Sequence, residues 1–284
     1  MKIEHTIQGV RAALRSAKAS GKSIAFVPTM GNLHAGHIHL INEAKRRADF
    51  VVCSIFVNPT QFGANEDFSS YPRTLDRDGA LLAEADCDLL FAPAATEIYS
   101  NGLNQLTSVH VSEVTEQLCG ASRPGHFTGV ATIVTKLLNI ISPDMALFGQ
   151  KDYQQLAVIK QLVHDLFLPV NIIGIATVRD TDGLALSSRN QYMTELQRSK
   201  APLLYKTLCN IRDALQKPGN IADEVIAQAK TTLKQGGFKV DYLSVHSLDL
   251  NDFDASHTQA VVLVAAHLGK TRLIDNLIFD LQQN

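Results

Sequence analysis

His34 and His37 stand three residues apart on either side of Gly36, and this spacing gives the first indication of chemistry. An apolar run at residues 24–27 precedes them and a helix-periodic run at residues 38–48 follows, so we expect a strand, a tight loop and a helix. A helix N-terminus offers unpaired N–H groups and the positive end of the peptide dipoles, which favour phosphate. Glycine allows close backbone approach, and imidazoles donate further hydrogen bonds. A nucleoside triphosphate is therefore the first ligand to consider; the alternative is a helix start whose histidines are exposed or satisfied internally.

A second polar group follows the apolar run at residues 50–57. Asn58 and Gln61 offer neutral donors and acceptors, and Phe62 offers apolar surface. This combination suits a small ligand that carries hydroxyl, carboxylate and methyl groups. An ordinary Asn-Pro turn is the alternative interpretation.

Residues 148–155 form a third polar loop, between a predicted strand and a predicted helix. Gly149 permits close backbone approach, and Lys151 can meet a phosphate as a mobile point charge. Asp152 is placed to accept hydrogen bonds from ribose hydroxyls, or only to cap the helix. Gln155 lies one helical turn further on and can point into the same cleft.

The fourth polar loop covers residues 178–190. Its hydroxyls at Ser187 and Ser188, followed by the guanidinium of Arg189, can grip a polyphosphate. A hydrated loop between domains is the alternative, because loops are polar by default.

Alternating elements must position these loops. Apolar runs typical of strands lie at residues 23–27, 50–57, 88–91, 145–148 and 170–178, and helical patterns lie at 7–17, 38–48, 75–85, 130–141 and 156–168. Near-continuous apolar strands separated by helices predict an α/β fold with a parallel sheet covered on both faces. Ligands of such sheets bind beyond the carboxyl ends of the strands, where the polar loops lie.

The chain changes character near residue 177. Two helical patterns, at residues 202–215 and 221–233, precede strand-like runs at 239–245, 260–266 and 271–279. This order indicates a smaller α+β domain. We therefore predict two domains, residues 1–176 and residues 177–284.

The bulk properties favour a globular protein of the cytoplasm. The 284 residues are 45% apolar and 19% charged, and the net charge of -2 gives no argument for nucleic acid or membrane partners. No apolar run approaches the ~18 residues that span a bilayer, and the segment Met1–His5 lacks the apolar core of a signal peptide. The four scattered cysteines predict reduced thiols, rather than a disulfide framework or a zinc site.

Six segments, taken together and in order, resemble the pantothenate synthetase (pantoate–β-alanine ligase) family along essentially the whole chain. They are Val27–Gly31, His34–His37, Phe56–Phe62, Arg123–Phe127, Gly149–Gln155 and Leu186–Arg189. The family belongs to the nucleotidyltransferase superfamily, whose paired signatures resemble those of class I aminoacyl-tRNA synthetases. His34–His37 matches the first signature and Leu186–Arg189 the second.

The resemblance implies a two-step reaction. ATP and (R)-pantoate give pantoyl adenylate and pyrophosphate, and β-alanine then attacks the adenylate to give pantothenate and AMP. The resemblance also implies Mg²⁺ with the triphosphate, a Rossmann-like N-terminal domain, a C-terminal domain that acts as a partial lid, and a homodimer.

The resemblance further implies the site residues. His34, His37, Lys151 and Arg189 are the implied catalytic group, and His37 stands where the family has a proton donor. Gln61, Gln155 and Asn58 are the implied pantoate and β-alanine ligands. The implied ATP ligands are Met30, Gly31, Asn32, Leu33, His34, Ala35, Gly36, His37, Gly149, Gln150, Lys151, Asp152, Val178, Leu186, Ser187, Ser188 and Arg189.

Two positions depart from the family pattern. Gln150 stands where the family usually has Glu, which removes a negative charge near the nucleotide loop. Leu186 stands where it usually has Met, a residue of similar volume.

Two other functions remain open at this point. One is an adenylyl- or cytidylyltransferase with the same signatures and another acceptor. The other is a nucleotide-binding regulator without turnover, which needs only the phosphate loops and has no use for Asn58, Gln61 and Gln155. Pyrophosphate exchange into ATP, with and without pantoate, separates these functions from a ligase.

Overall fold

A computed structural model describes residues 1–63, 66–103, 106–217, 219–254 and 257–281 of the chain. Its contacts divide the chain into two compact units. The first consists of Met1–Gln150 with Gln155–Ala176, and the second of Lys151–Gln154 with Thr177–Asn284. The short segment Lys151–Gln154 thus groups with the C-terminal unit, which a single boundary along the sequence does not capture.

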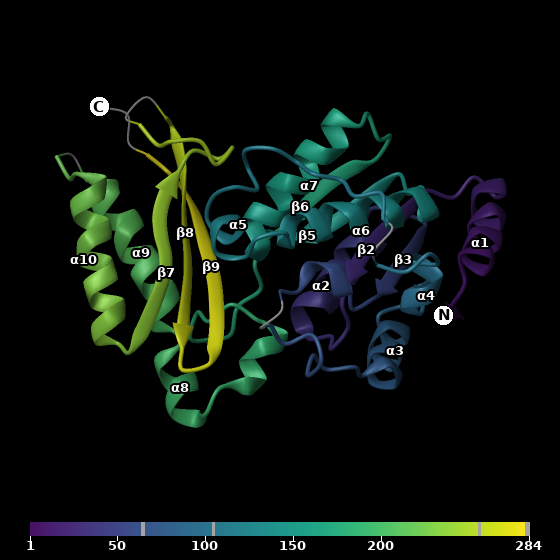
Figure 1. Cartoon of the computed structure of the whole chain (residues 1–284), viewed down its shortest axis with the longest axis horizontal. Coiled ribbons are helices and arrows are strands. Elements are labelled where there is room, and N and C mark those ends of the chain that lie inside the picture. Colours follow the sequence, from purple (N-terminus) through teal and green to yellow (C-terminus); the bar gives the residue numbers. More distant parts are fainter. Residues whose placement is uncertain (64–65, 104–105, 218, 255–256, 282–284) are drawn as a thin grey trace. The chain divides into compact units, whose positions relative to one another are not determined.

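A parallel sheet forms the centre of the first unit (Figure 1). Its six strands lie in the order β1-β4-β3-β2-β5-β6, and every pairing between neighbours is parallel. The strands are β1 (Lys2–Glu4), β2 (Ile24–Thr29), β3 (Phe50–Ile55), β4 (Leu89–Phe91), β5 (Met145–Gly149) and β6 (Asn171–Ile175). The helices are α1 (Ile7–Ala19), α2 (Ala35–Lys45), α3 (Leu75–Glu84), α4 (Ala95–Ile98), α5 (Cys119–Ser122), α6 (His126–Ile141) and α7 (Tyr153–Asp165), with 3₁₀ turns η1 (Pro59–Gln61) and η2 (Gln150–Asp152).

Both faces of this sheet are covered. Ala25 and Val27 of β2 belong to a buried cluster with Leu40 and Ile41 of α2. The alternate residue Phe26 is also fully buried, so the opposite face carries a second layer. This burial explains the continuous apolar runs in the strands.

The strand order creates a reversal point between β2 and β5. From β2 the chain continues outward to β3 and β4, and it then returns to place β5 on the other side of β2. Ligands of doubly wound sheets bind at such a point, beyond the carboxyl ends of the strands. The loops that begin at Met30 and at Gln150 leave the sheet here.

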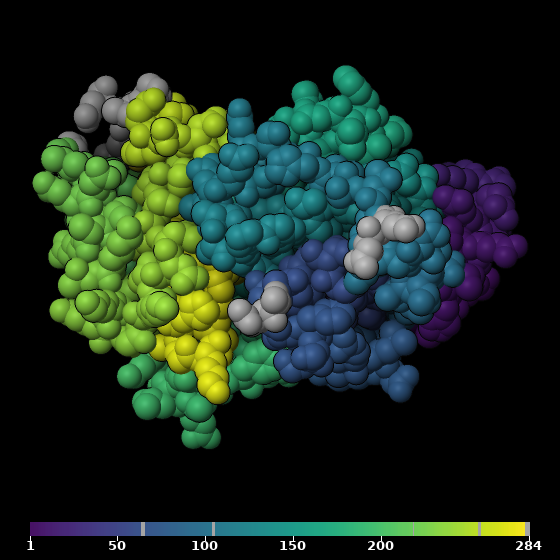
Figure 2. Space-filling model, in the orientation of Figure 1, coloured from purple at the N-terminus to yellow at the C-terminus, as the bar shows by residue number. Residues whose placement is uncertain are grey.

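The second unit contains a three-stranded antiparallel sheet in the order β7-β8-β9. Its elements are α8 (Glu195–Lys200), α9 (Leu203–Leu215), α10 (Ala222–Gln235), β7 (Phe238–His246), β8 (Gln259–Leu268) and β9 (Thr271–Asp280), with a 3₁₀ turn η3 (Ser188–Tyr192). Leu204, Leu208 and Leu233 of the helices pack with Val262 and Val264 of β8 in one core. Helix α10 forms part of the outer surface of this unit, in green in Figures 1 and 2.

The predicted fold class is confirmed: a Rossmann-like parallel sheet is followed by a smaller α+β unit. The four cysteines are free, and three of them are buried. Burial raises the pKa of Cys87 to about 11, so this thiol stays protonated. Within the described residues, every helix is too short or too polar to cross a bilayer.

Candidate active site

The two signature histidines cap helix α2. His34 is the N-cap residue, and its Nδ1 accepts a hydrogen bond from the backbone N–H of Gly36 at 3.1 Å. His37 reciprocates, because its Nδ1 accepts from the N–H of His34 at 3.3 Å, and the two ring centroids lie 4.1 Å apart. A neutral imidazole that accepts at Nδ1 carries its proton at Nε2. Each ring therefore has an N–H donor on the side away from the helix backbone, beside the positive end of the helix dipole.

Asp78 holds the loop before these histidines, and sequence reasoning missed it. Its carboxylate accepts from the N–H groups of Asn32 and Leu33 at 2.7 and 2.8 Å, and from the hydroxyl of Thr74 at 3.0 Å. Asp78 is completely buried, so these three donors replace its hydration. Gly31 and Asn32 have positive φ angles of 81° and 50°, and the carboxylate fixes this tight conformation.

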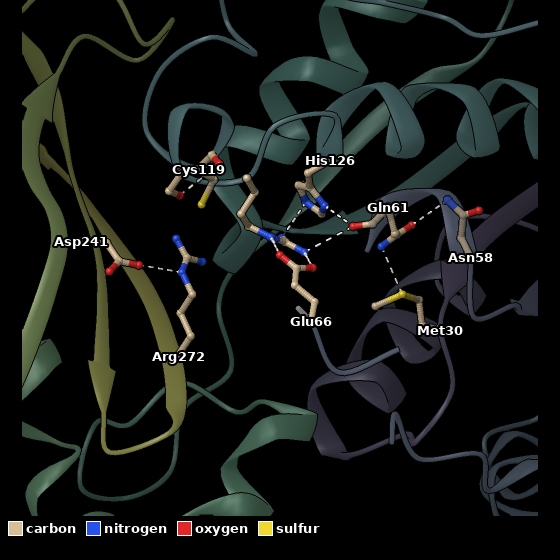
Figure 3. A network of polar contacts seen from close by, with 10 residues as sticks. Met30, Asn58, Gln61, Glu66, Cys119, His126, Asp241 and Arg272 are labelled. Atoms are coloured by element: carbon tan, nitrogen blue, oxygen red, sulfur yellow. Dashed lines mark hydrogen bonds and ion pairs between the residues drawn. The ribbon is translucent and has the colours of Figure 1, made fainter. Parts of the chain in front are cut away.

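Gln61 stands at the carboxyl end of the neighbouring strand, on turn η1. Its Nε2 donates to the Sδ atom of Met30 at 3.1 Å, so the loops after β2 and β3 meet as Figure 3 shows. A thioether is a weak acceptor, which a substrate oxygen can replace at little cost. The side chain of Asn58 donates to Gln61 Oε1 at 3.1 Å.

A second cluster holds Gln61 from its backbone side. The carbonyl oxygen of Gln61 lies 2.8 Å from Nδ1 of His126 and accepts from Nη2 of Arg123 at 3.4 Å. Arg123 also forms a bidentate ion pair with Glu66, with distances of 2.6 and 2.5 Å (Figure 3). Burial raises the pKa of Glu66, but the hydrogen bond and charge of Arg123 outweigh it and hold the pKa below its ordinary value. Arg123 and His126 belong to a segment that resembles the family, but the sequence alone assigned them no role.

The remaining predicted residues of the first unit lie near the same strand ends. Gly149 ends β5 and Gln150 begins η2. Gly174 of β6 has no room for a Cβ atom, which would meet Leu156 at 2.6 Å and the Gln150 side chain at 3.2 Å. Gln155 is half-buried in the first turn of α7.

In the second unit, Lys151 is held through its backbone. The carbonyl oxygen of Lys151 accepts from Nδ2 of Asn276 on β9 at 2.9 Å. The hydroxyl of Tyr153 donates to the carbonyl of Leu248 at 2.8 Å. Asp152 is exposed, and its carboxylate lies 3.9 Å from the Lys151 ammonium. These contacts explain why Lys151–Gln154 groups with the C-terminal unit.

The loop that carries Arg189 is built on a buried ion pair. Arg179 binds Asp275 bidentately at 2.6 and 2.8 Å, and its guanidinium lies 3.6 Å from the ring centroid of Tyr205. Burial raises the pKa of Asp275, although the contact with Arg179 opposes this shift. Val178 belongs to the same backbone structure, since its carbonyl accepts from the N–H of Leu186 at 3.0 Å.

The two predicted serines differ in their surroundings. Ser187 caps turn η3, because its Oγ accepts from the N–H of Arg189 at 3.2 Å. Ser188 and Arg189 lie within that turn and are half-buried.

The predicted ATP ligands belong to two different units of the chain. Met30–His37, Gly149 and Gln150 belong to the first, and Lys151, Asp152, Val178 and Leu186–Arg189 to the second.

Comparison with known proteins agrees with this geometry. A family profile described as Pantoate-beta-alanine ligase matches residues 2–278. The chain is 54% identical to pantothenate synthetase of Pseudomonas fluorescens (strain Pf0-1) over 277 residues, which are 97% of each protein.

Solved structures give the same result. The crystal structure of pantothenate synthetase from Thermus thermophilus is 45% identical, with a TM-score of 0.91, and the match covers 98% of this chain and 99% of that one. The pantoate-β-alanine ligase of Francisella tularensis, in complex with β,γ-ATP and β-alanine, is 38% identical, with a TM-score of 0.81 and coverage of 98% and 97%. The chain described here belongs to the pantoate–β-alanine ligase family.

Proposed function

We propose that this protein joins (R)-pantoate to β-alanine at the expense of ATP, through pantoyl adenylate. The observation that supports this proposal lies in the first unit. Two imidazole N–H donors at a helix N-terminus suit phosphate, and the carboxamide N–H of Gln61 at the next strand end suits a carboxylate or hydroxyl. A transferase with another acceptor, or a regulator without turnover, accounts less well for family membership across residues 2–278.

In the first step, a carboxylate oxygen of pantoate attacks the α-phosphorus of ATP. The bond to the bridging oxygen breaks, and pyrophosphate leaves. Pantoate is already ionised at neutral pH, so no protein nucleophile is required. The task of the site is to align two anions and to neutralise the charge that moves to pyrophosphate.

The proposed phosphate ligands are His34 and His37 through their Nε2–H groups, together with Lys151, Ser187, Ser188 and Arg189. His37 is proposed to donate a hydrogen bond from Nε2–H to the departing phosphate, without giving up its proton. We propose that Asp152 binds the ribose hydroxyls and that the backbone of Val178 contacts adenine. The other proposed nucleotide ligands are Met30, Gly31, Asn32, Leu33, Ala35, Gly36, Gly149, Gln150 and Leu186. Because Asn32 and Leu33 give their N–H groups to Asp78, their part is to shape the loop.

In the second step, the amine of β-alanine attacks the acyl carbon of pantoyl adenylate. The bond between that carbon and the phosphate oxygen breaks, AMP leaves, and the amine loses a proton. We propose that Gln61 and Gln155 hold pantoate, that Gln61 later holds β-alanine, and that Asn58 assists beside Gln61. The acyl group is already activated, so orientation supplies most of what this step needs.

The proposal also covers Mg²⁺, assembly and location. Mg²⁺ prefers phosphate oxygens, water and one or two carboxylates, and it would neutralise triphosphate charge. The described residues contain no cluster of three or more His, Cys, Asp or Glu side chains that could hold a metal ion, so we propose that the ion is carried chiefly by the triphosphate. We further propose a homodimer in the cytoplasm.

Isotope exchange between pyrophosphate and ATP tests the mechanism. We expect exchange that requires pantoate and proceeds without β-alanine, because adenylate formation is reversible and needs no amine. Exchange in the absence of pantoate, or a covalent adenylyl-protein on a denaturing gel, would contradict the proposal.

A further inference from the structure

The carboxamide of Asn58 has only one possible orientation. Its Nδ2 donates to the carbonyl oxygen of Gly129 at 3.2 Å, and its Oδ1 accepts from the backbone N–H of Thr60 at 3.4 Å. A carbonyl can only accept and a backbone N–H can only donate, so the two ends of the amide cannot be exchanged. Asn58 is 1% exposed, so these protein groups, rather than bulk solvent, set its orientation.

This orientation also determines that of Gln61. The second hydrogen of Asn58 Nδ2 points to the Gln61 carboxamide at 3.1 Å, so the atom that receives it must be the oxygen. The nitrogen of Gln61 then faces the opposite way, where it contacts Met30 Sδ. Gln61 thus presents an N–H donor, rather than a carbonyl oxygen, on the side of Met30.

Tyr99 makes the shortest of the contacts that hold Asn58. Its hydroxyl donates to Asn58 Oδ1 at 2.6 Å, and the hydroxyl of Thr60 donates to the same oxygen at 3.0 Å. Tyr99 is 4% exposed, and its ring lies under the ammonium of Lys136, which is 4.5 Å from the ring centroid. Burial raises the pKa of Tyr99 above its ordinary value, so the hydroxyl keeps its proton and remains a donor.

We infer that Tyr99 is a positioning residue for the acceptor substrate: its hydroxyl anchors the Asn58 side chain beside Gln61, and Asn58, whose direction the Gly129 carbonyl and the Thr60 N–H determine, makes Gln61 offer an N–H group to an oxygen of pantoate. Tyr99 acts without touching the substrate. The inference rests on the proposed role of Gln61 as a pantoate ligand.

The direction of the amide matters because pantoate is an anion rich in acceptors. Its carboxylate can only accept, so a Gln61 oxygen in the same place would repel it and leave two buried acceptors without a donor. A glutamine fixed as a donor also selects against ligands that present an N–H group at this point.

The test compares Michaelis constants for pantoate and for ATP in four variants. Tyr99→Phe removes only the hydroxyl and leaves the ring in place. Asn58→Asp turns an acceptor toward Gln61, so that the Gln61 amide must reverse. Gln61→Ala removes the group that is positioned, and Tyr99→Phe is repeated in that background. Tyr242→Phe, on β7, is the matched control.

We expect Tyr99→Phe to raise the KM for pantoate by about threefold to tenfold, the range for one lost hydrogen bond, with the KM for ATP changed less than about twofold. Asn58→Asp should raise the KM for pantoate more, by about tenfold or greater, because a donor is replaced by a repelling acceptor. In the Gln61→Ala background, Tyr99→Phe should have no further effect on pantoate, since no amide is left to orient.

Four results would overturn the inference. Equal increases in the KM values for pantoate and ATP, or an unchanged effect of Tyr99→Phe in the Gln61→Ala background, would make Tyr99 a structural residue. If the KM for pantoate rises in Gln61→Ala but not in Tyr99→Phe or Asn58→Asp, Gln61 remains a pantoate ligand and Tyr99 has no positioning role. An unchanged pantoate KM in Gln61→Ala would remove the proposed role of Gln61, and the inference with it.

Discussion

Single buried side chains hold the candidate site, and Asp78 is the clearest case. Its two carboxylate oxygens each accept a backbone N–H from the loop before His34. A carboxylate can satisfy both donors at once, whereas an amide of the same shape has one oxygen and one NH₂ group. Two acceptor oxygens, and not only the shape of the side chain, are required here.

We expect Asp78→Asn to weaken ATP binding and to lower stability by about 1–3 kcal/mol, because one buried N–H group loses its acceptor. Thermal melting and the KM for ATP measure the two effects. Asp76→Asn is the matched control, since Asp76 is exposed in the first turn of the same helix. Equal behaviour of the two variants would mean that the loop is held without Asp78.

At the residue scale, the sequence predicted the candidate site residues that belong to motifs and missed the residues that hold them in place. The predicted residues lie in recognisable motifs that follow strands: His34, His37, Gln61 and Lys151. Asp78 and Tyr99 lie 41 or more residues from the groups they hold, in short or ordinary helical segments. Their roles depend on tertiary contacts, which no local pattern encodes.

At the scale of elements, helix α6 and turn η1 form one rigid support. They approach so closely that a Cβ atom on Gly129 would lie 2.2 Å from the carbonyl oxygen of Thr60. The same close approach lets the Gly129 carbonyl accept from Asn58. Glycine is therefore required at this point of the helix for packing, despite its low helix propensity.

We expect Gly129→Ala to lower stability by about 1–3 kcal/mol, because the added methyl group overpacks the contact. It should also raise the KM for pantoate, since η1 carries Gln61. Gly79→Ala is the control: Gly79 lies inside α3, a Cβ there meets nothing within 4 Å, and stability should rise by about 0.5–1 kcal/mol. If both alanine variants gain stability, the contact between α6 and η1 is not tight.

The core elements were predictable because strong apolar periodicity marks them. The runs at residues 50–57 and 145–148 correspond to β3 and β5, and those at residues 260–266 and 271–279 to β8 and β9. Three helices begin earlier than their apolar patterns predicted: α2, α6 and α7. Helix α2 begins at Ala35 because His34 caps it, and α6 begins at His126 after Gly125, whose φ is 80°. Such starts depend on capping contacts rather than on apolar spacing.

The apolar residues of segment 109–114 illustrate the opposite case. The sequence alone does not decide whether they and the apolar residues of segment 50–57 pair with a partner or are buried within the subunit. Residues 50–55 form a strand with neighbours on both sides, and Val111 is buried in an irregular segment. Edge strand β1 has three residues, too few for a periodic signal.

At the scale of the molecule, the two half-reactions make different demands on the proposed phosphate ligands. Adenylate formation must stabilise a departing pyrophosphate, whereas attack by β-alanine releases only AMP. His37 belongs to the first unit and Lys151 to the second. If both act on the triphosphate, their loss should impair the same half-reaction, although each is mounted on a different unit.

We expect His37→Ala and Lys151→Ala each to slow adenylate formation by about tenfold to a thousandfold, the range for removing a donor to developing charge. Both variants should convert synthetic pantoyl adenylate and β-alanine far better than ATP and pantoate, because no triphosphate has to bind. His37→Ala should also cost about 0.5–2 kcal/mol of stability through its lost cap contact with His34. Lys151→Ala should have a melting temperature close to that of the parent protein, because the contact of Lys151 with Asn276 is made by its backbone carbonyl and not by its side chain.

Single-turnover kinetics of the separate half-reactions, with melting curves, measures these effects. The controls are His39→Ala, on the same helix as His37, and Lys160→Ala, an exposed lysine of α7. Because two residues along a helix turn a side chain by about 200°, His39 points away from the face that His37 occupies. A variant that slows both half-reactions equally would assign its residue to holding the structure, and a normal rate of adenylate formation would remove it from the phosphate site.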